Sequence, residues 1–208
     1  GALREVRVMK RVPVVLSLLV LLLFASCASA SLVELKPGAD ELKRMSVFLS
    51  NFTEVGFFEI EDVSWLTGDD LVYFGIRHNY INNFKSRIRP CKVKNCPYGS
   101  MTIEAKWVAE SVKKYFDIDF KQHDDAEEPL KAHYDGKLYH FDGSDGDVVY
   151  YAQVQTVARD GNVFHFKGHL YNVSDKKEIP ALFRATAKAH TFGGKKTWAL
   201  LSIETVWN

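Results

Sequence analysis

The chain has 208 residues, and its 27 lysine and arginine residues nearly balance its 26 aspartate and glutamate residues. No long basic stripe interrupts this balance, so the sequence lacks the electrostatic footprint of a nucleic-acid-binding protein. Aromatic residues make up 13% of the chain, a share that suits a β-rich core and would equally supply a stacking surface.

The first segment of the chain has the pattern of an export signal. Lys10 and Arg11 introduce an apolar run that ends at Phe24, and small residues follow it. These are the three regions of a secretory signal peptide, and the apolar run is too short to span a bilayer comfortably. We therefore expect residues 9–30 to be an export signal and residues 1–8 to be an upstream extension or a cloning remnant.

Cys27 makes this interpretation more specific. The segment Leu23-Phe24-Ala25-Ser26-Cys27 resembles the lipobox of bacterial envelope lipoproteins, although leucine is more usual at the position of Phe24. The resemblance implies that Cys27 is acylated and holds the protein on a membrane surface of the cell envelope, with residues 31–38 as a tether. The alternatives are ordinary cleavage after Ala30, which would give a secreted or periplasmic soluble protein, and an uncleaved anchor.

Cys91 and Cys96 remain as an even pair if Cys27 carries lipid. Export favours a disulfide between them, and closing so short a loop would stabilise the fold by roughly 2 kcal/mol. Free thiols are the alternative. A zinc site needs further ligands, and no other cysteine or histidine lies close by in the sequence. We therefore expect neither a metal nor a cofactor.

Three helices are expected in the first half of the domain. Asp40 can cap the first helix, where apolar residues recur at helical spacing. Thr67 and Asp70 have the spacing of a capping box and begin the second helix, and the third lies near residues 102–116. His78 falls on the apolar stripe of the second helix, which favours a satisfied core histidine over a catalytic one.

The second half of the chain alternates with period two between turn dipeptides, which predicts β-hairpins. The apolar residues of the first two long strands all have even numbers, so they share a face only if even-numbered residues pair with even-numbered residues. A two-residue turn would pair even-numbered residues with odd-numbered ones. We therefore expect a three-residue loop at Asp160-Gly161, with Thr156 opposite Phe164, and an odd loop around residues 193–195.

The last hairpin carries a row of small residues, Ala185, Ala187 and Ala189, that alternate with polar neighbours. Such a row leaves room either for a closely packed helix, which is the commoner arrangement, or for a cavity. In the second case the three alanines and His78 are possible pocket-lining residues. The same register places Trp198 on the opposite face, where it could be exposed.

Helices followed by an antiparallel meander predict an α+β fold, with the N-terminal helices packed on one face of the C-terminal sheet. We expect a single domain over residues 39–208. This order of elements is similar to the cystatin-like and nuclear-transport-factor-like folds. The resemblance rests on element order and on no motif, and a fold does not dictate a function.

Known catalytic, phosphate-binding and dinucleotide-binding fingerprints do not occur in the sequence. His165 and His169 lie four residues apart on one strand, roughly 13 Å, which is too far for them to share an ion. We therefore expect a non-enzymatic binding or interaction role with an unidentified ligand. The alternatives are a secreted enzyme with its site between helices and sheet, and a cystatin-like inhibitor or structural envelope component that acts through an exposed hairpin edge.

Overall fold

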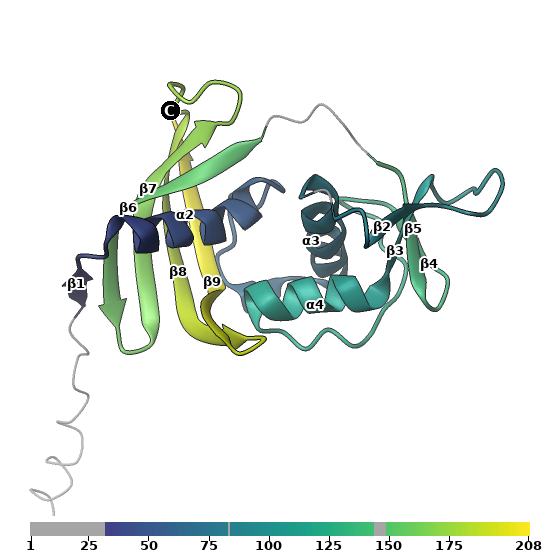
Figure 1. Ribbon diagram of the computed structural model, residues 1–208, viewed down its shortest axis with the longest axis horizontal. Helices are drawn as coiled ribbons and strands as arrows, with labels where there is room; N and C mark the ends of the chain where they lie inside the picture. Colours follow the sequence, from purple (N-terminus) through teal and green to yellow (C-terminus); the bar gives the residue numbers. More distant parts are fainter. Residues whose placement is uncertain (1–31, 83, 144–148) are drawn as a thin grey trace, which may run out of the picture. The chain divides into compact units, whose positions relative to one another are not determined.

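The computed structural model describes residues 32–82, 84–143 and 149–208. Over these residues the protein has three α-helices and two antiparallel sheets (Figure 1), so the predicted α+β fold class is confirmed. The expected signal and Cys27 lie outside the described residues. Within the described ranges, none of the helices combines the length and the apolar character needed to cross a membrane.

The larger sheet collects the first strand and the last four. Its strands are β1 (Val33–Leu35), β6 (Tyr150–Asp160), β7 (Val163–Asn172), β8 (Ala181–Phe192) and β9 (Lys195–Trp207), hydrogen-bonded in this order. Strand β1 pairs antiparallel with β6, with Val33 opposite Arg159. Residues 33–35 of the predicted tether therefore belong to the sheet, where their backbone groups cover an edge of β6 that would otherwise be unpaired.

In the β6–β7 hairpin, a bulge within β6, and not a longer loop, brings the apolar residues of both strands to the same face of the sheet. Asp160 pairs with Val163 across a two-residue turn, so the expected pairing of Thr156 with Phe164 is wrong. The register shifts between Val154 and Thr156. The extra residue of this bulge returns the apolar residues on both sides of it to one face of the sheet.

The β8–β9 hairpin also combines a two-residue turn with a bulge within a strand. Phe192 pairs with Lys195, and the register shifts between Thr186 and Ala187. Both glycines of the two-residue turn have a positive φ, 55° and 75°, as a tight hairpin of this kind requires. The odd loop expected here is therefore wrong. The expected exposed face for Trp198 is also wrong, because its side chain is 7% exposed and belongs to the core.

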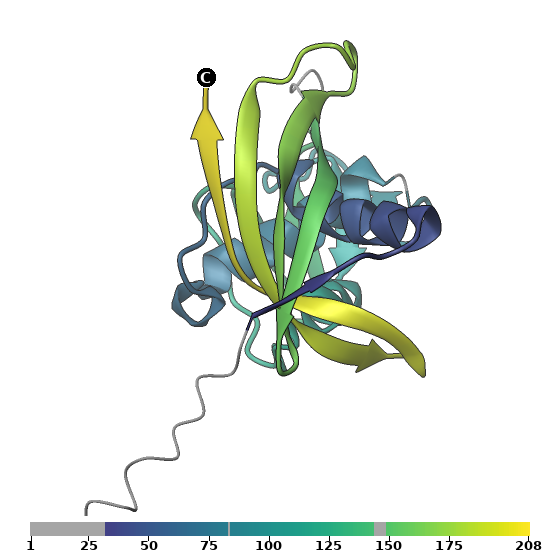
Figure 2. The same cartoon turned by 90° about the vertical axis from the view of Figure 1, so that its left-hand side faces the viewer.

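Helix α2 (Ala39–Thr53) covers one face of the larger sheet (Figures 1 and 2). Its buried side chains join those of the sheet in one apolar cluster, and the α2 members are Met45, Phe48, Leu49 and Phe52. Two helix hydroxyls fix α2 on β6, because the N–H groups of Ala152 and Val154 donate to Ser50 and Ser46, each at 3.0 Å. Ala185 and Ala187 lie in this cluster and are 3% and 0% exposed. The pocket considered beneath them is therefore filled.

The smaller sheet and the two other helices build a second apolar cluster. The sheet has the order β2 (Ile88–Pro90), β3 (Met101–Glu104), β5 (Leu138–Phe141), β4 (Ala132–Tyr134), and the helices are α3 (Gly68–Ile81) and α4 (Ala105–Phe116). A short 3₁₀ helix, η1 (Val63–Trp65), precedes α3. Helices α3 and α4 approach so closely that a Cβ on Gly75 would lie 2.6 Å from Val108.

The predicted start is confirmed for α3, whereas α2 and α4 begin at other residues than predicted. The capping box of α3 is confirmed: the N–H of Asp70 donates to the Thr67 hydroxyl, and the N–H of Thr67 donates to the Asp70 carboxylate. Gly38, and not Asp40, is the N-cap of α2; the Asp40 carboxylate lies in the first turn, where it favours the helix dipole. Helix α4 starts later than predicted because residues 101–104 pair as strand β3.

Asp117 joins the end of α4 to the larger sheet. It has a left-handed backbone (φ 57°), and its carboxylate lies 2.7 Å from the ammonium groups of both Lys113 and Lys188. These two partners lower the pKa of Asp117 to about 2. A folded-state pKa below the ordinary value means that the ion pairs stabilise the fold above about pH 4 and lose this effect as the pH falls towards 2.

We expect Asp117→Asn to lower the free energy of unfolding by about 1 kcal/mol near neutral pH. Asparagine tolerates the left-handed backbone, so the change removes charge and little else. The difference from the wild type, measured by urea unfolding, should shrink as the pH falls from about 4 to about 2. Asp119→Asn is the control, since Asp119 also contacts Lys113 but its side chain is 70% exposed. A difference that does not change with pH would contradict this assignment.

Candidate metal centre

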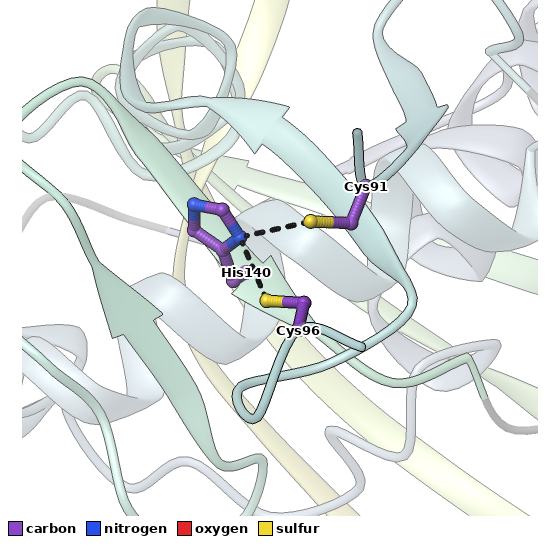
Figure 3. A group of neighbouring side chains, drawn as sticks. All are labelled: Cys91, Cys96 and His140. Carbon is purple, nitrogen blue, oxygen red and sulfur yellow. Dashed lines mark hydrogen bonds between the residues drawn. The ribbon is translucent and has the colours of Figure 1, made fainter. Parts of the chain in front are cut away.

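Three side chains from distant parts of the sequence meet at the smaller sheet (Figure 3). Cys91 directly follows β2, and its N–H donates to the carbonyl of Ser100 at 2.8 Å. Cys96 follows Asn95, whose left-handed backbone (φ 53°) turns the short loop. His140 lies on β5, the strand beside β3. The loop after β2 and the middle of β5 therefore bring two thiols and one imidazole together.

The spacing of these three groups is that of metal ligands. The Nδ1 atom of His140 lies 3.5 Å from the Sγ atom of Cys91 and 3.5 Å from that of Cys96, as Figure 3 shows. All three ligand atoms lie within 4.8 Å of one another. A tetrahedral zinc ion with ordinary Zn–S and Zn–N bond lengths places its sulfur and nitrogen ligands about 3.5 Å apart. The two nitrogen–sulfur distances therefore match two edges of such a tetrahedron.

Asp135 orients the imidazole from its other side. Its Oδ2 lies 2.9 Å from Nε2 of His140, and its Oδ1 accepts the N–H groups of Lys137 and Leu138. Burial opposes ionisation of Asp135, but the hydrogen bond to His140 and the two backbone N–H groups together lower its pKa to about 2. Burial lowers the pKa of His140, but Asp135 and Cys96 outweigh it and raise this pKa. When the ring is neutral, the contact with the ionised carboxylate favours the proton on Nε2, and the lone pair then lies on Nδ1, which faces the sulfurs. Metal-bound histidines almost always donate their other N–H to a carboxylate, a backbone carbonyl or water.

The two thiols differ in acidity. The backbone N–H of Tyr98 is the main cause that lowers the pKa of Cys96, helped by Cys91 and His140. For Cys91, the N–H of Val93 also lowers the pKa, but burial and the neighbouring Cys96 together outweigh it, so the pKa of Cys91 is raised. Cys96 is therefore the first of the pair to become a thiolate, which is the form that binds metals.

A second histidine lies beside the group without joining it. His133 on β4 pairs with His140 in the sheet, and the ring centroids are 6.1 Å apart. Its Nδ1 lies 3.0 Å from an oxygen of Asp125, and its ring stacks on Tyr98 at 3.8 Å. Among the described residues, the ligand group thus has three members. The fourth position of a tetrahedral ion is left to water or to a ligand molecule.

The expected disulfide is not formed in the structure, because Cys91 and Cys96 are free cysteines. The argument against a metal considered only nearby ligands, and His140 lies 44 residues beyond Cys96. The sequence indicates only the hairpin that carries His140. The Asp135-Gly136 turn predicts a hairpin, and His140 lies on the return strand of that hairpin. What the sequence did not indicate is that this strand pairs with β3, immediately after the cysteine loop.

The structure does not bring the other predicted pocket residues together. His78 is 4% exposed, stacks on Phe74 and lies 3.6 Å from a carboxylate oxygen of Glu54. Burial lowers the pKa of His78, although the hydrogen bond with Glu54 opposes this. His78 borders a cavity beside α3 and α4, whereas Ala189 is exposed and borders a separate cavity next to Trp198. Cys27, the predicted lipid site, lies outside the described residues.

No protein-family model, curated protein or solved structure matches this chain. The interpretation of the three-residue group therefore depends on its own geometry and chemistry, and on the export pattern in the sequence.

We expect Cys96 to react severalfold faster than Cys91 with iodoacetamide at neutral pH in the reduced, metal-free protein, because the thiolate is the nucleophile. Trypsin cleaves after Lys92, so mass spectrometry can quantify the two sites on separate peptides. His140→Asn should reduce the advantage of Cys96, since it removes a group that lowers the pKa of that thiol. His165→Asn, on β7, is the control. Equal rates in the wild type would show that the assigned order of acidity is wrong.

Proposed function

We propose that this chain is an exported envelope protein that binds a thiophilic divalent metal ion, with zinc as the best fit, through Cys91, Cys96 and His140. One observation carries the proposal: Nδ1 of His140 lies 3.5 Å from both sulfurs while Asp135 holds the opposite nitrogen. Neither a cysteine pair that only forms a disulfide nor a core histidine requires this combination.

The ligand atoms select the class of metal. Two sulfurs and one imidazole nitrogen suit zinc and other soft or borderline ions, whereas magnesium and calcium prefer oxygen ligands. Two thiolates and a neutral imidazole also balance the charge of a divalent ion. Binding would release the thiol protons, so the affinity should rise with pH as Cys91 loses its proton more readily.

Three protein ligands favour a role in binding and exchange of the ion. Structural zinc sites are usually closed by four protein ligands, and sites with three keep one exchangeable position. The cysteine loop follows β2, the edge strand of the smaller sheet, and both cysteines are partly exposed. A metal at this site would therefore be accessible to incoming ligands, as capture and release of an ion require.

The proposed location rests on the N-terminal sequence. The basic residues, the apolar run and the small residues of 9–30 form an export signal, and the lipobox-like segment ends at Cys27. Acylation of Cys27 would attach the domain to a membrane surface and would remove its thiol from competition with Cys91 and Cys96.

We expect the reduced wild type to bind one Zn²⁺ or Co²⁺ per chain, measured by competition with a chromogenic chelator, and Co²⁺ to give thiolate-to-metal charge-transfer absorption. Cys91→Ser and Cys96→Ser should each abolish this absorption or weaken it severely, because each removes one sulfur ligand. Asp135→Asn should weaken binding about 10- to 100-fold, since the carboxylate orients His140 but is not itself a ligand.

His165→Asn provides the matched control, because it removes an imidazole from the larger sheet without touching the three ligands. If this change weakens binding as much as Cys96→Ser does, the site is not the one proposed. Absence of a one-to-one complex in the reduced wild type would refute metal binding altogether.

We expect intact-mass analysis of the protein expressed with its full N-terminus in a bacterial host to find a mature chain that begins at an acylated Cys27. Cys27→Ser should prevent the modification and release the protein from the membrane fraction, whereas Cys91→Ser should leave the lipid in place. An unmodified wild-type chain that begins at Ser31 would contradict lipid attachment.

A further inference from the structure

A cavity separate from the metal centre lies beside α3, α4 and the β8–β9 turn and has a volume of about 450 Å³. Five of its lining residues are cationic and one is acidic; these are Arg44, Arg87, Lys114, Lys195, Lys196 and Glu110. The cations come from four parts of the chain, namely α2, the segment before β2, α4 and the start of β9. The fold therefore gathers positive charge around one hollow, although the whole chain is nearly neutral.

The acidic residue is already engaged by one of the cations. The guanidinium of Arg87 lies 2.8 Å from the Glu110 carboxylate and donates to Asn79 at 3.1 Å. The same guanidinium lies over the Trp107 ring, 4.3 Å from its centroid. Arg87 is thus held in place, and its charge is offset by Glu110. Besides this pair, four cationic residues line the cavity.

The remaining cations act on one another. Lys114 is partly buried, with its ammonium over the Tyr115 ring at 4.8 Å. Burial lowers the pKa of Lys114, and the charges of Arg87 and Lys195 lower it further, although Glu110 opposes them. The Arg44 guanidinium donates to the backbone carbonyl of Lys196 at 3.2 Å, which brings its charge to the start of β9. Like charges held this close around a hollow create a positive potential that favours an incoming anion.

The wall of the cavity also has an apolar part. Phe84 and Phe192 border it, and Phe84 is 39% exposed. Ser111 and Thr197 add hydroxyl groups to the lining. Small-molecule sites typically combine such an apolar wall with a few charged or polar groups in a cavity of 300–1,000 Å³.

We propose that this cavity binds a small organic anion that carries a carboxylate or phosphate group. The charged group lies among Lys114, Lys195 and Lys196, and the apolar part lies against Phe84 and Phe192. The proposal does not depend on metal binding, because none of the three metal ligands borders this cavity.

Isothermal titration calorimetry of the full chain with phenyl phosphate tests the proposal. We expect saturable one-to-one binding that is tighter than binding of inorganic phosphate, and no binding of the neutral analogue benzyl alcohol. Lys195→Gln combined with Lys196→Gln should weaken the binding of phenyl phosphate about tenfold or more, which corresponds to the loss of at least 1.4 kcal/mol. Arg44→Gln is a second variant with the same expected direction and a smaller effect.

The matched control combines Lys176→Gln with Lys177→Gln. This pair also consists of two adjacent exposed lysines, in the segment between β7 and β8, and the net charge changes equally. It should change the affinity less than about twofold, since the pair lies outside the cavity lining. An equal loss in both double variants would overturn the proposal in favour of diffuse attraction. The proposal would also be overturned if the wild type bound phenyl phosphate no better than benzyl alcohol. Zinc binding by all variants separates either outcome from a failure of the metal centre.

Discussion

Antiparallel pairing of β5 with both β3 and β4 is the constraint on which the candidate metal centre depends. It places His140 beside the residues that follow the cysteine loop, and it holds the imidazole at a fixed height in the sheet. The hydrogen bond to Asp135 then fixes the rotation of the ring. Without the pairing the two thiols would have no nitrogen partner, and without the hydrogen bond the tautomer that presents Nδ1 would not be selected.

The larger sheet contributes to the other apolar cluster, in which α2 and residues of α3 and α4 pack against one of its faces. The two bulges in β6 to β9 allow tight two-residue turns and still keep the apolar residues against the helix. Ala185 and Ala187 let the helical layer approach closely, and Phe48, Phe52 and Trp198 fill the space. Little room is left there for a ligand. The open cavities lie at the ends of the elements, where charged side chains gather around the β8–β9 turn.

Features that depend on near neighbours could be predicted from the sequence. The capping box at Thr67 and Asp70 involves two residues three positions apart. Glycines of positive φ mark where the two hairpins turn, although each loop has two residues and not the odd number expected. The bulge at Val154 could not be predicted, because one inserted residue leaves the alternating pattern nearly intact on each side. His140 was missed as a ligand for a related reason, since only the order of strands in the smaller sheet brings it to Cys96.

A disulfide and the proposed metal site would use the same two sulfurs, and the contacts of the surrounding residues are the argument for the metal. A disulfide between Cys91 and Cys96 would consume both thiolates and would gain nothing from an oriented imidazole. Yet the protein keeps Asp135 ionised, with a pKa of about 2, beside the nitrogen of His140 that faces away from the sulfurs. The N–H of Tyr98 also lowers the pKa of Cys96, whereas the pKa of Cys91 is raised. A divalent ion at this position would use the oriented imidazole and the more acidic thiol of Cys96, and its binding would displace the proton that Asp135 and Cys96 favour on His140.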